Sequence, residues 1–199
     1  AIAALDQALA LAEKNDKDSV AAARLHISLC HNWAMWADGF TTHEGQAPRR
    51  EKQKHHGERA EAILEAKRAA GELAAEDLVL LGEAKVTISG ASGMMSHPTD
   101  PTFYANLVSD KAEEAAAIFK ECGSPLILKA EQAVACGLCT KAIATNNGAV
   151  FAGKSAIDLF LDAFAIFEKV DKDYMRLNGQ PSYFIADHTA TCGTYQGWA

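Results

Sequence analysis

Two cysteines spaced as Cys-Gly-Leu-Cys, Cys136 and Cys139, are the first residues to consider for redox or metal chemistry. Such a pair becomes reactive where a helix N-terminus or a neighbouring cation lowers the pKa of one thiol. Here the pair falls in the middle of an expected helix, and Thr140 stands where a c-type haem motif would need histidine. Two small residues three positions apart also pack well in a helical core, and we favour that interpretation.

The histidines and methionines form no metal-ligand pattern along the sequence. His26 and His31 share an expected helix, but a spacing of five does not place them on one face as a spacing of four would. Met94, Met95 and His97 lie in an expected loop, where soft ligands could bind Cu(I), although a flexible apolar loop explains them better. We therefore predict no cofactor, no metal site and no enzymatic activity. A helical metal or redox protein that uses the cysteine pair and the histidines is kept as an alternative.

A group of aromatic residues is the strongest candidate for recognition of a partner. Aromatic side chains offer a large contact area with few rotamers to restrict. Because the group falls on the first helix of an expected helix pair, it could face a groove together with polar residues of a later helix. Packing between helix layers is the alternative, since both tryptophans lie at helical spacing. The predicted partner-binding residues are Trp33, Trp36, His31, Phe40, Glu131 and Gln132.

The elements that must position these residues are helices, as the composition already indicates. Of the 199 residues, 39 are alanine and only 5 are proline. Alanine has the highest helix propensity and is depleted in strands, so an all-β fold is excluded. The length suits one domain, and we treat residues 1–199 as a single helical unit.

Hydrophobic residues recur at steps of three and four residues along most of the chain and predict eight helices. Local signals set several helix ends: Ser19 is placed as an N-cap, and Gly123-Ser124-Pro125 ends one helix and begins the next. Residues 40–56 and 90–98 are expected to be irregular. The predicted helices cover residues 1–14, 19–38, 56–70, 75–89, 101–122, 125–145, 154–170 and 182–192.

Three of these helices share a pattern of small residues spaced against large apolar ones before a charged turn, namely residues 1–13, 113–122 and 156–169. This pattern resembles the second helix of a tetratricopeptide repeat, where small residues let paired helices approach closely. The chain departs from that family in its longer spacing between similar helices, and the Trp-Leu-Gly-Tyr pattern is absent as a set. The resemblance implies a right-handed solenoid that binds partner proteins, and it extends to the exported T-component of tripartite periplasmic transporters.

An all-α fold of about eight helices in stacked antiparallel hairpins is therefore expected, with a closed helical bundle as the alternative. The first expected function is that of a non-enzymatic helical-repeat scaffold that binds a protein or peptide partner. The second is a self-assembling subunit of a homo-oligomer or fibre, in which copies of the chain cover its exposed helix faces.

The charge balance limits the classes of partner. The formal net charge of −7 argues against a nucleic-acid partner, because an acidic surface repels phosphates. The basic stretch from Arg49 to Arg68 is interleaved with glutamates and is interpreted as a solvated helix. No apolar run is long enough to span a bilayer, so no transmembrane segment is expected. The compartment stays open, with a slight preference for a periplasmic or secreted protein because the chain starts at Ala1 within a helical pattern.

Overall fold

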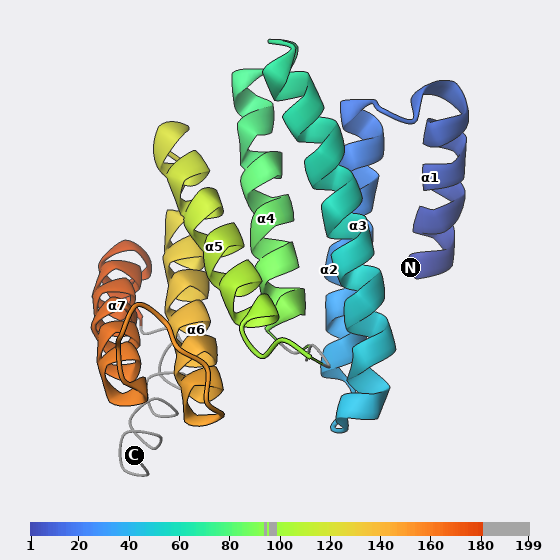
Figure 1. The fold of residues 1–199 in the computed structure, drawn as a ribbon. Coiled ribbons are helices and arrows are strands. Elements are labelled where there is room, and N and C mark those ends of the chain that lie inside the picture. The colour runs from blue at the N-terminus through green and yellow to red at the C-terminus, as the bar shows by residue number, and fades with distance from the viewer. Residues whose placement is uncertain (94, 96–98, 181–199) are drawn as a thin grey trace.

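The computed structural model describes residues 1–93, 95 and 99–180 of the chain (Figure 1). These residues form seven α-helices and one short 3-10 helix, with no β-strand among them. The helices are α1 (Ile2–Asp16), α2 (Val20–Asp38), α3 (His43–Ala69), α4 (Leu78–Ser92), α5 (Phe103–Glu121), α6 (Ile127–Asn146) and α7 (Ala156–Asn178), and the 3-10 turn Ala75–Asp77 precedes α4. The eighth predicted helix, residues 182–192, lies outside the described residues.

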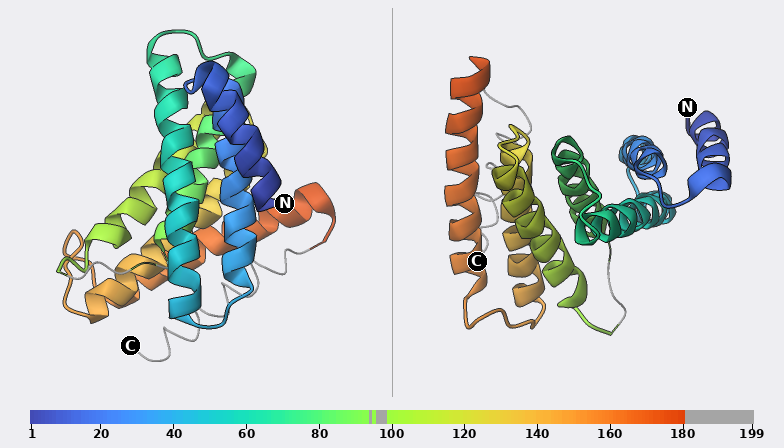
Figure 2. Two further views of the ribbon diagram at one scale, coloured as in Figure 1. Left: turned by 90° about the vertical axis from the view of Figure 1, so that its right-hand side faces the viewer. Right: turned by 90° about the horizontal axis from the view of Figure 1, so that it is seen from above.

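The helices form an open row in which each packs against its neighbours in the sequence. Helix α2 also contacts α4, and α4 also contacts α6. Helices α1 and α7 lie at opposite ends of the row, as both the front and the top views show (Figures 1 and 2). The prediction of an all-α fold with adjacent helices packed together is confirmed, and the row is not closed into a bundle. Membership of the tetratricopeptide family stays a prediction.

Capping residues account for several helix ends, and the ends at Ser19 and Gly123 were predicted from the sequence. The Ser19 hydroxyl oxygen accepts a hydrogen bond from the amide of Ala22 at 3.1 Å and caps α2. Ser155 and Asp158 form a reciprocal capping box at the start of α7. Between α5 and α6, Gly123 adopts the left-handed conformation, with φ +64°, that ends a helix.

The prediction that residues 40–56 are irregular is wrong, because α3 already begins at His43. Thr42 caps this helix, and its hydroxyl oxygen accepts a hydrogen bond from the amide of Gly45. The buried side-chain amide of Gln53 donates to the backbone carbonyl of Thr87 on α4 at 3.1 Å, and the backbone carbonyl of Gln53 accepts from the Cys30 thiol on α2. These tertiary contacts hold the polar first half of α3 helical despite Pro48 within it.

Helix α7 also exceeds its predicted range, since it continues to Asn178 instead of ending near Val170. Buried Val170 and half-buried Tyr174 extend its packing face by further turns. Gly179, with φ +71°, then ends the helix in the left-handed conformation. The turn at Asn178-Gly179, present in the sequence, is therefore the true end of this helix.

Small residues let the helices approach closely, and buried alanines occur on every helix from α2 to α7. A Cβ added to Gly82 on α4 would lie 2.5 Å from the ring of Phe119 on α5. A Cβ on Gly57 of α3 would meet Ile88 of α4 at 2.7 Å. The glycines and alanines thus fix the interhelical distances through close-packed contacts.

A buried ion cluster ties α3, α4 and α5 together. Lys85 of α4 is 4% exposed, and its ammonium lies 2.6 Å from both Glu61 of α3 and Glu114 of α5. Lys111 of α5 shares the same two carboxylates. Although burial opposes it, hydrogen bonding to these carboxylates raises the pKa of Lys85 above its ordinary value, so the cluster stays charged. None of the described helices is long and apolar enough to cross a membrane.

Candidate partner-binding site

Four residues at the junction of α2 and α3 form one stacked group, which we call the aromatic–arginine cluster: Trp33, Trp36, Phe40 and Arg49. The rings of Trp33 and Trp36 stack with centroids 5.1 Å apart. The Arg49 guanidinium carbon lies 4.5 Å from the Trp36 ring centroid and 3.7 Å from that of Phe40. Both distances are within the range of cation–π attraction, so the arginine joins the two rings into one surface.

The first turns of α3 hold the cluster in place. Gly45 leaves room for Phe40, because a Cβ at Gly45 would lie 2.8 Å from the Phe40 ring. The Gln46 side chain donates to the carbonyl of Phe40 at 2.6 Å, and the Arg49 guanidinium donates to the carbonyl of Gly45 at 2.5 Å. These contacts restrict the rotamers of the side chains in the cluster.

The cluster is partly open to solvent. Trp36 is 47% exposed, and its neighbour Met35 is 74% exposed. Trp33 is half-buried and packs against the core that α1, α2, α3 and α4 share. Trp33 therefore packs between helix layers, which was the alternative to a role in binding. Trp36 and Met35 remain on the surface. Exposed aromatic and methionine side chains next to an arginine are typical of protein-contact surfaces.

The other predicted site residues lie elsewhere. Burial and the charge of Lys129 on α6 lower the pKa of His31, while Glu83 on α4 opposes them. His31 lies about 200° around α2 from Trp33, as their two-residue spacing requires. Glu131 accepts a hydrogen bond from Lys169 of α7 at 2.5 Å, and Gln132 is half-buried beside it in the sequence. The structure therefore unites Trp33, Trp36 and Phe40 but not the remaining three.

Sequence reasoning passed over Arg49, the residue that completes the cluster. Because residues 40–56 were expected to be irregular, Arg49 was interpreted as part of a solvated basic stretch. Once α3 begins at His43, Arg49 falls on its second turn, next to the end of α2. The cap signal Thr42, followed by Glu44 in the first turn, was the local sign of that helix start.

The cysteine pair lies in the packed interior of the row. Cys136 and Cys139 are half-buried against the core cluster around Phe160 and Phe167, in agreement with a packing role. Burial raises the pKa of Cys30 to about 12, so this thiol stays protonated at neutral pH. The described residues contain no group of three or more histidine, cysteine or acidic side chains arranged to hold a metal ion. Of the predicted loop ligands, Met94 and His97 lie outside those residues.

A histidine pair, buried at His26 and half-buried at His56, joins α2 to α3. The Nδ1 atoms of His26 and His56 lie 2.9 Å apart, so one ring must donate and the other accept a hydrogen bond. Burial lowers the pKa of both to about 4, helped at His26 by Arg59 and at His56 by His26. On α1, Glu13 lies 3.6 Å from Nε2 of His26. The pair is neutral at pH 7.

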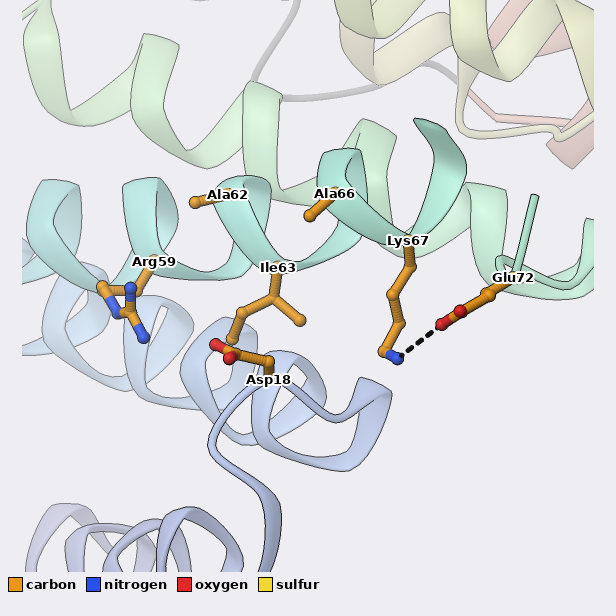
Figure 3. A pocket seen from close by; sticks show the side chains of 7 residues that line it. All are labelled: Asp18, Arg59, Ala62, Ile63, Ala66, Lys67 and Glu72. Carbon is orange, nitrogen blue, oxygen red and sulfur yellow. Dashed lines mark hydrogen bonds and ion pairs between the residues drawn. The ribbon is translucent and has the colours of Figure 1, made fainter. Parts of the chain in front are cut away.

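Further along α3, a shallow pocket of about 330 Å³ opens beside the turn between α1 and α2 (Figure 3). Arg59 and Lys67 flank its apolar floor at Ile63, and Asp18 reaches toward it from the turn (Figure 3). Lys67 pairs with Glu72 at 3.4 Å. One of the two cations of this pocket is thus already paired with an acidic side chain of the same chain, which makes the pocket a weaker ligand site than the aromatic–arginine cluster.

Comparisons with protein-family models, with curated proteins and with solved structures found no significant match. Function is therefore argued from the geometry of the chain itself.

Proposed function

We propose that this protein is a non-enzymatic helical scaffold that binds a protein or peptide partner through the aromatic–arginine cluster and Met35. The observation that carries the proposal is the half-exposed Trp36, whose ring stacks with that of Trp33 and lies under the Arg49 guanidinium. A tryptophan left in water costs free energy that a partner would recover on covering it. Because its rotamer is already fixed by the stack, little side-chain entropy is lost on binding.

Site-directed photo-crosslinking tests this proposal. A photoreactive amino acid in place of Met35, in the full-length protein in its source cells, should capture one protein in stoichiometric yield. The same group in place of Met175 on α7, also exposed, serves as the matched control. Adding Trp36→Ala to the Met35 probe should abolish the adduct, because hot-spot aromatic residues dominate interface energy. Equal adducts from both positions, or an adduct that survives Trp36→Ala, would contradict the proposal.

A second candidate function is self-assembly, favoured by the outer face of α7. Ile157, Leu161 and Phe164 lie at steps of four and three residues, and Leu161 is 51% exposed. Such a stripe on the last described helix of an open row suits a contact with a second copy. Sedimentation velocity over a wide concentration range should then show an oligomer that Leu161→Lys dissociates. A monomer at every concentration would exclude this candidate.

A further inference from the structure

The pocket beside the turn between α1 and α2 is lined along one side by a single stripe of α3 (Figure 3). The stripe follows helical periodicity and consists of Arg59, Ala62, Ile63, Ala66 and Lys67. Ile63 is 3% exposed and forms the floor, while the two alanines leave the space above it open. At about 330 Å³ the pocket lies near the lower end of the range for ligand sites, about 300–1,000 Å³, which suits a small ligand.

Arg59 carries a positive charge at one end of this pocket. Within the described part of the chain its guanidinium makes no hydrogen bond and no ion pair, although the side chain is half-buried. Its charge reaches His26, where it adds to burial in lowering the pKa of that histidine. A guanidinium binds a carboxylate through two parallel hydrogen bonds. This end of the pocket therefore suits the carboxylate of a ligand.

Asp18 brings the opposite charge to the pocket from the turn between α1 and α2 (Figure 3). Its backbone amide donates a hydrogen bond to the Asp16 carboxylate at 3.1 Å, which helps to fix the turn. The Asp18 carboxylate itself has no hydrogen bond or ion pair with another described residue. At the other end of the pocket Lys67 is already paired with Glu72. The two lining charges left for a ligand are therefore Arg59 and Asp18, which have opposite signs.

We propose that this pocket binds a small apolar zwitterion, an amino acid or a short peptide, whose carboxylate binds Arg59, whose ammonium binds Asp18 and whose apolar part covers Ile63. Charge complementarity favours a zwitterion, because Asp18 would repel a simple anion and Arg59 a simple cation. The pocket shares no residue with the aromatic–arginine cluster, so this site is additional to the proposed function. Because the pocket is shallow and solvent-exposed ion pairs are weak, we expect a Kd of about 0.1–1 mM.

Nuclear magnetic resonance of isoleucine methyl groups in the full-length protein tests the inference. The probes are free leucine and the dipeptide leucyl-leucine, and the one that binds more tightly identifies the ligand as an amino acid or a short peptide. Saturation with that probe should shift the methyl signal of Ile63 and leave that of Ile157 on α7 unchanged. N-acetylleucine, which lacks the ammonium, and leucine amide, which lacks the carboxylate, should each bind at least about tenfold more weakly.

Variants with matched controls on α3 locate the binding site. Arg59→Gln should weaken the tighter probe at least about tenfold. Arg68→Gln, which breaks the exposed pair with Glu121 outside the pocket, should leave the Kd unchanged. Ala66→Leu fills the open space and should abolish binding, whereas Ala69→Leu, at an exposed position that does not line the pocket, should not.

Four results would overturn the inference. The first is an unshifted Ile63 signal with both probes at about ten times the expected Kd. The second is equal affinity for N-acetylleucine, which would make the pocket an anion site, and the third is equal affinity for leucine amide, which would make it a cation site. The fourth is binding that survives Arg59→Gln unchanged. None of these results bears on the aromatic–arginine cluster, whose role is decided by the photo-adduct at Met35.

Discussion

Gly82 allows α4 and α5 to pack closely, because it has only a hydrogen atom where other residues carry a side chain. An added Cβ would lie 2.5 Å from one Phe119 ring carbon and 2.7 Å from the next. Gly82→Ala should therefore destabilise the protein by about 1–3 kcal/mol, the usual cost of overpacking a core. Urea denaturation followed by circular dichroism measures this change.

Gly90 on the same helix is the matched control for Gly82. A Cβ there meets nothing within 4 Å, so only helix propensity changes. Gly90→Ala should stabilise the protein by about 0.5–1 kcal/mol. Equal effects of the two substitutions would contradict the close α4–α5 contact.

The second prediction for a single residue concerns Lys85 and the stability of its ion cluster. Lys85→Met would leave Glu61 and Glu114 with only Lys111 as a neighbouring cation. Breaking a buried ion pair usually costs about 3–5 kcal/mol of stability. Because Glu114 is partly exposed and its charge is partly screened by solvent, we expect Lys85→Met to lower the free energy of unfolding by about 2–4 kcal/mol. The exposed pair Lys154–Asp162 is the control, and Lys154→Met should leave the urea midpoint unchanged. A Lys85→Met protein of wild-type stability would mean that the cluster contributes no net stability.

At the scale of elements, the His26–His56 pair predicts that acid weakens the packing of α1, α2 and α3. Both folded-state pKa values lie near 4, below the ordinary value of 6.5, so the unfolded chain binds more protons between these two values. Stability is therefore complete above about pH 6.5 and falls as the pH decreases toward 4. We expect a loss of about 2–2.5 kcal/mol from each histidine, and so of about 5 kcal/mol from the pair, between about pH 7 and pH 4.5.

Urea denaturation at the two pH values measures that loss against a reference variant. His26→Gln/His56→Gln keeps two polar side chains in contact without a titrating group. The variant should show a smaller decrease in stability on acidification than the wild type. An identical decrease in both proteins would assign the pH dependence to other groups, the carboxylates among them.

The same elements show what could be predicted from the sequence. Helix ends with local signals, such as the Ser19 cap and the Gly123 turn, were predicted because the signal and the structure involve the same few residues. The start of α3 was missed, because its first half is polar and contains Pro48. That half is helical through contacts of Gln53 with α2 and α4, which no local pattern encodes.

The candidate site was predicted only in part, for a related reason. Trp33, Trp36 and Phe40 belong to one side of one helix and its end, so their proximity follows from helical periodicity. His31 was grouped with Trp33 by closeness in sequence, although two helical positions point in nearly opposite directions. Arg49 reaches the cluster from the next helix, and only the packing of α2 on α3 brings it there.

At the scale of the whole molecule, an open row predicts unequal local stability. Among the described helices α1 packs chiefly on α2, and Leu9 is its one buried residue. In such a row each element is stabilised by its immediate neighbours. Hydrogen exchange in the native protein should therefore be at least about tenfold faster for amides of α1 than for those of α2.

The variant Leu9→Ala tests whether α1 opens independently of the distant helices. Loss of this side chain should speed exchange in α1 and leave protection in α5, α6 and α7 unchanged, because α1 contacts none of them appreciably. Uniformly faster exchange across all seven helices would indicate one cooperative unit and contradict the independence of the ends.

The most direct measurement for partner binding is the affinity of the purified protein for the partner captured at Met35. Isothermal titration calorimetry would compare the wild type with Trp36→Ala and with Met175→Ala, which alters an exposed residue on α7. We predict that Trp36→Ala weakens the Kd by at least about 30-fold, equivalent to about 2 kcal/mol, and that Met175→Ala leaves it unchanged. An unchanged Kd in Trp36→Ala would contradict a partner-binding role for the aromatic–arginine cluster.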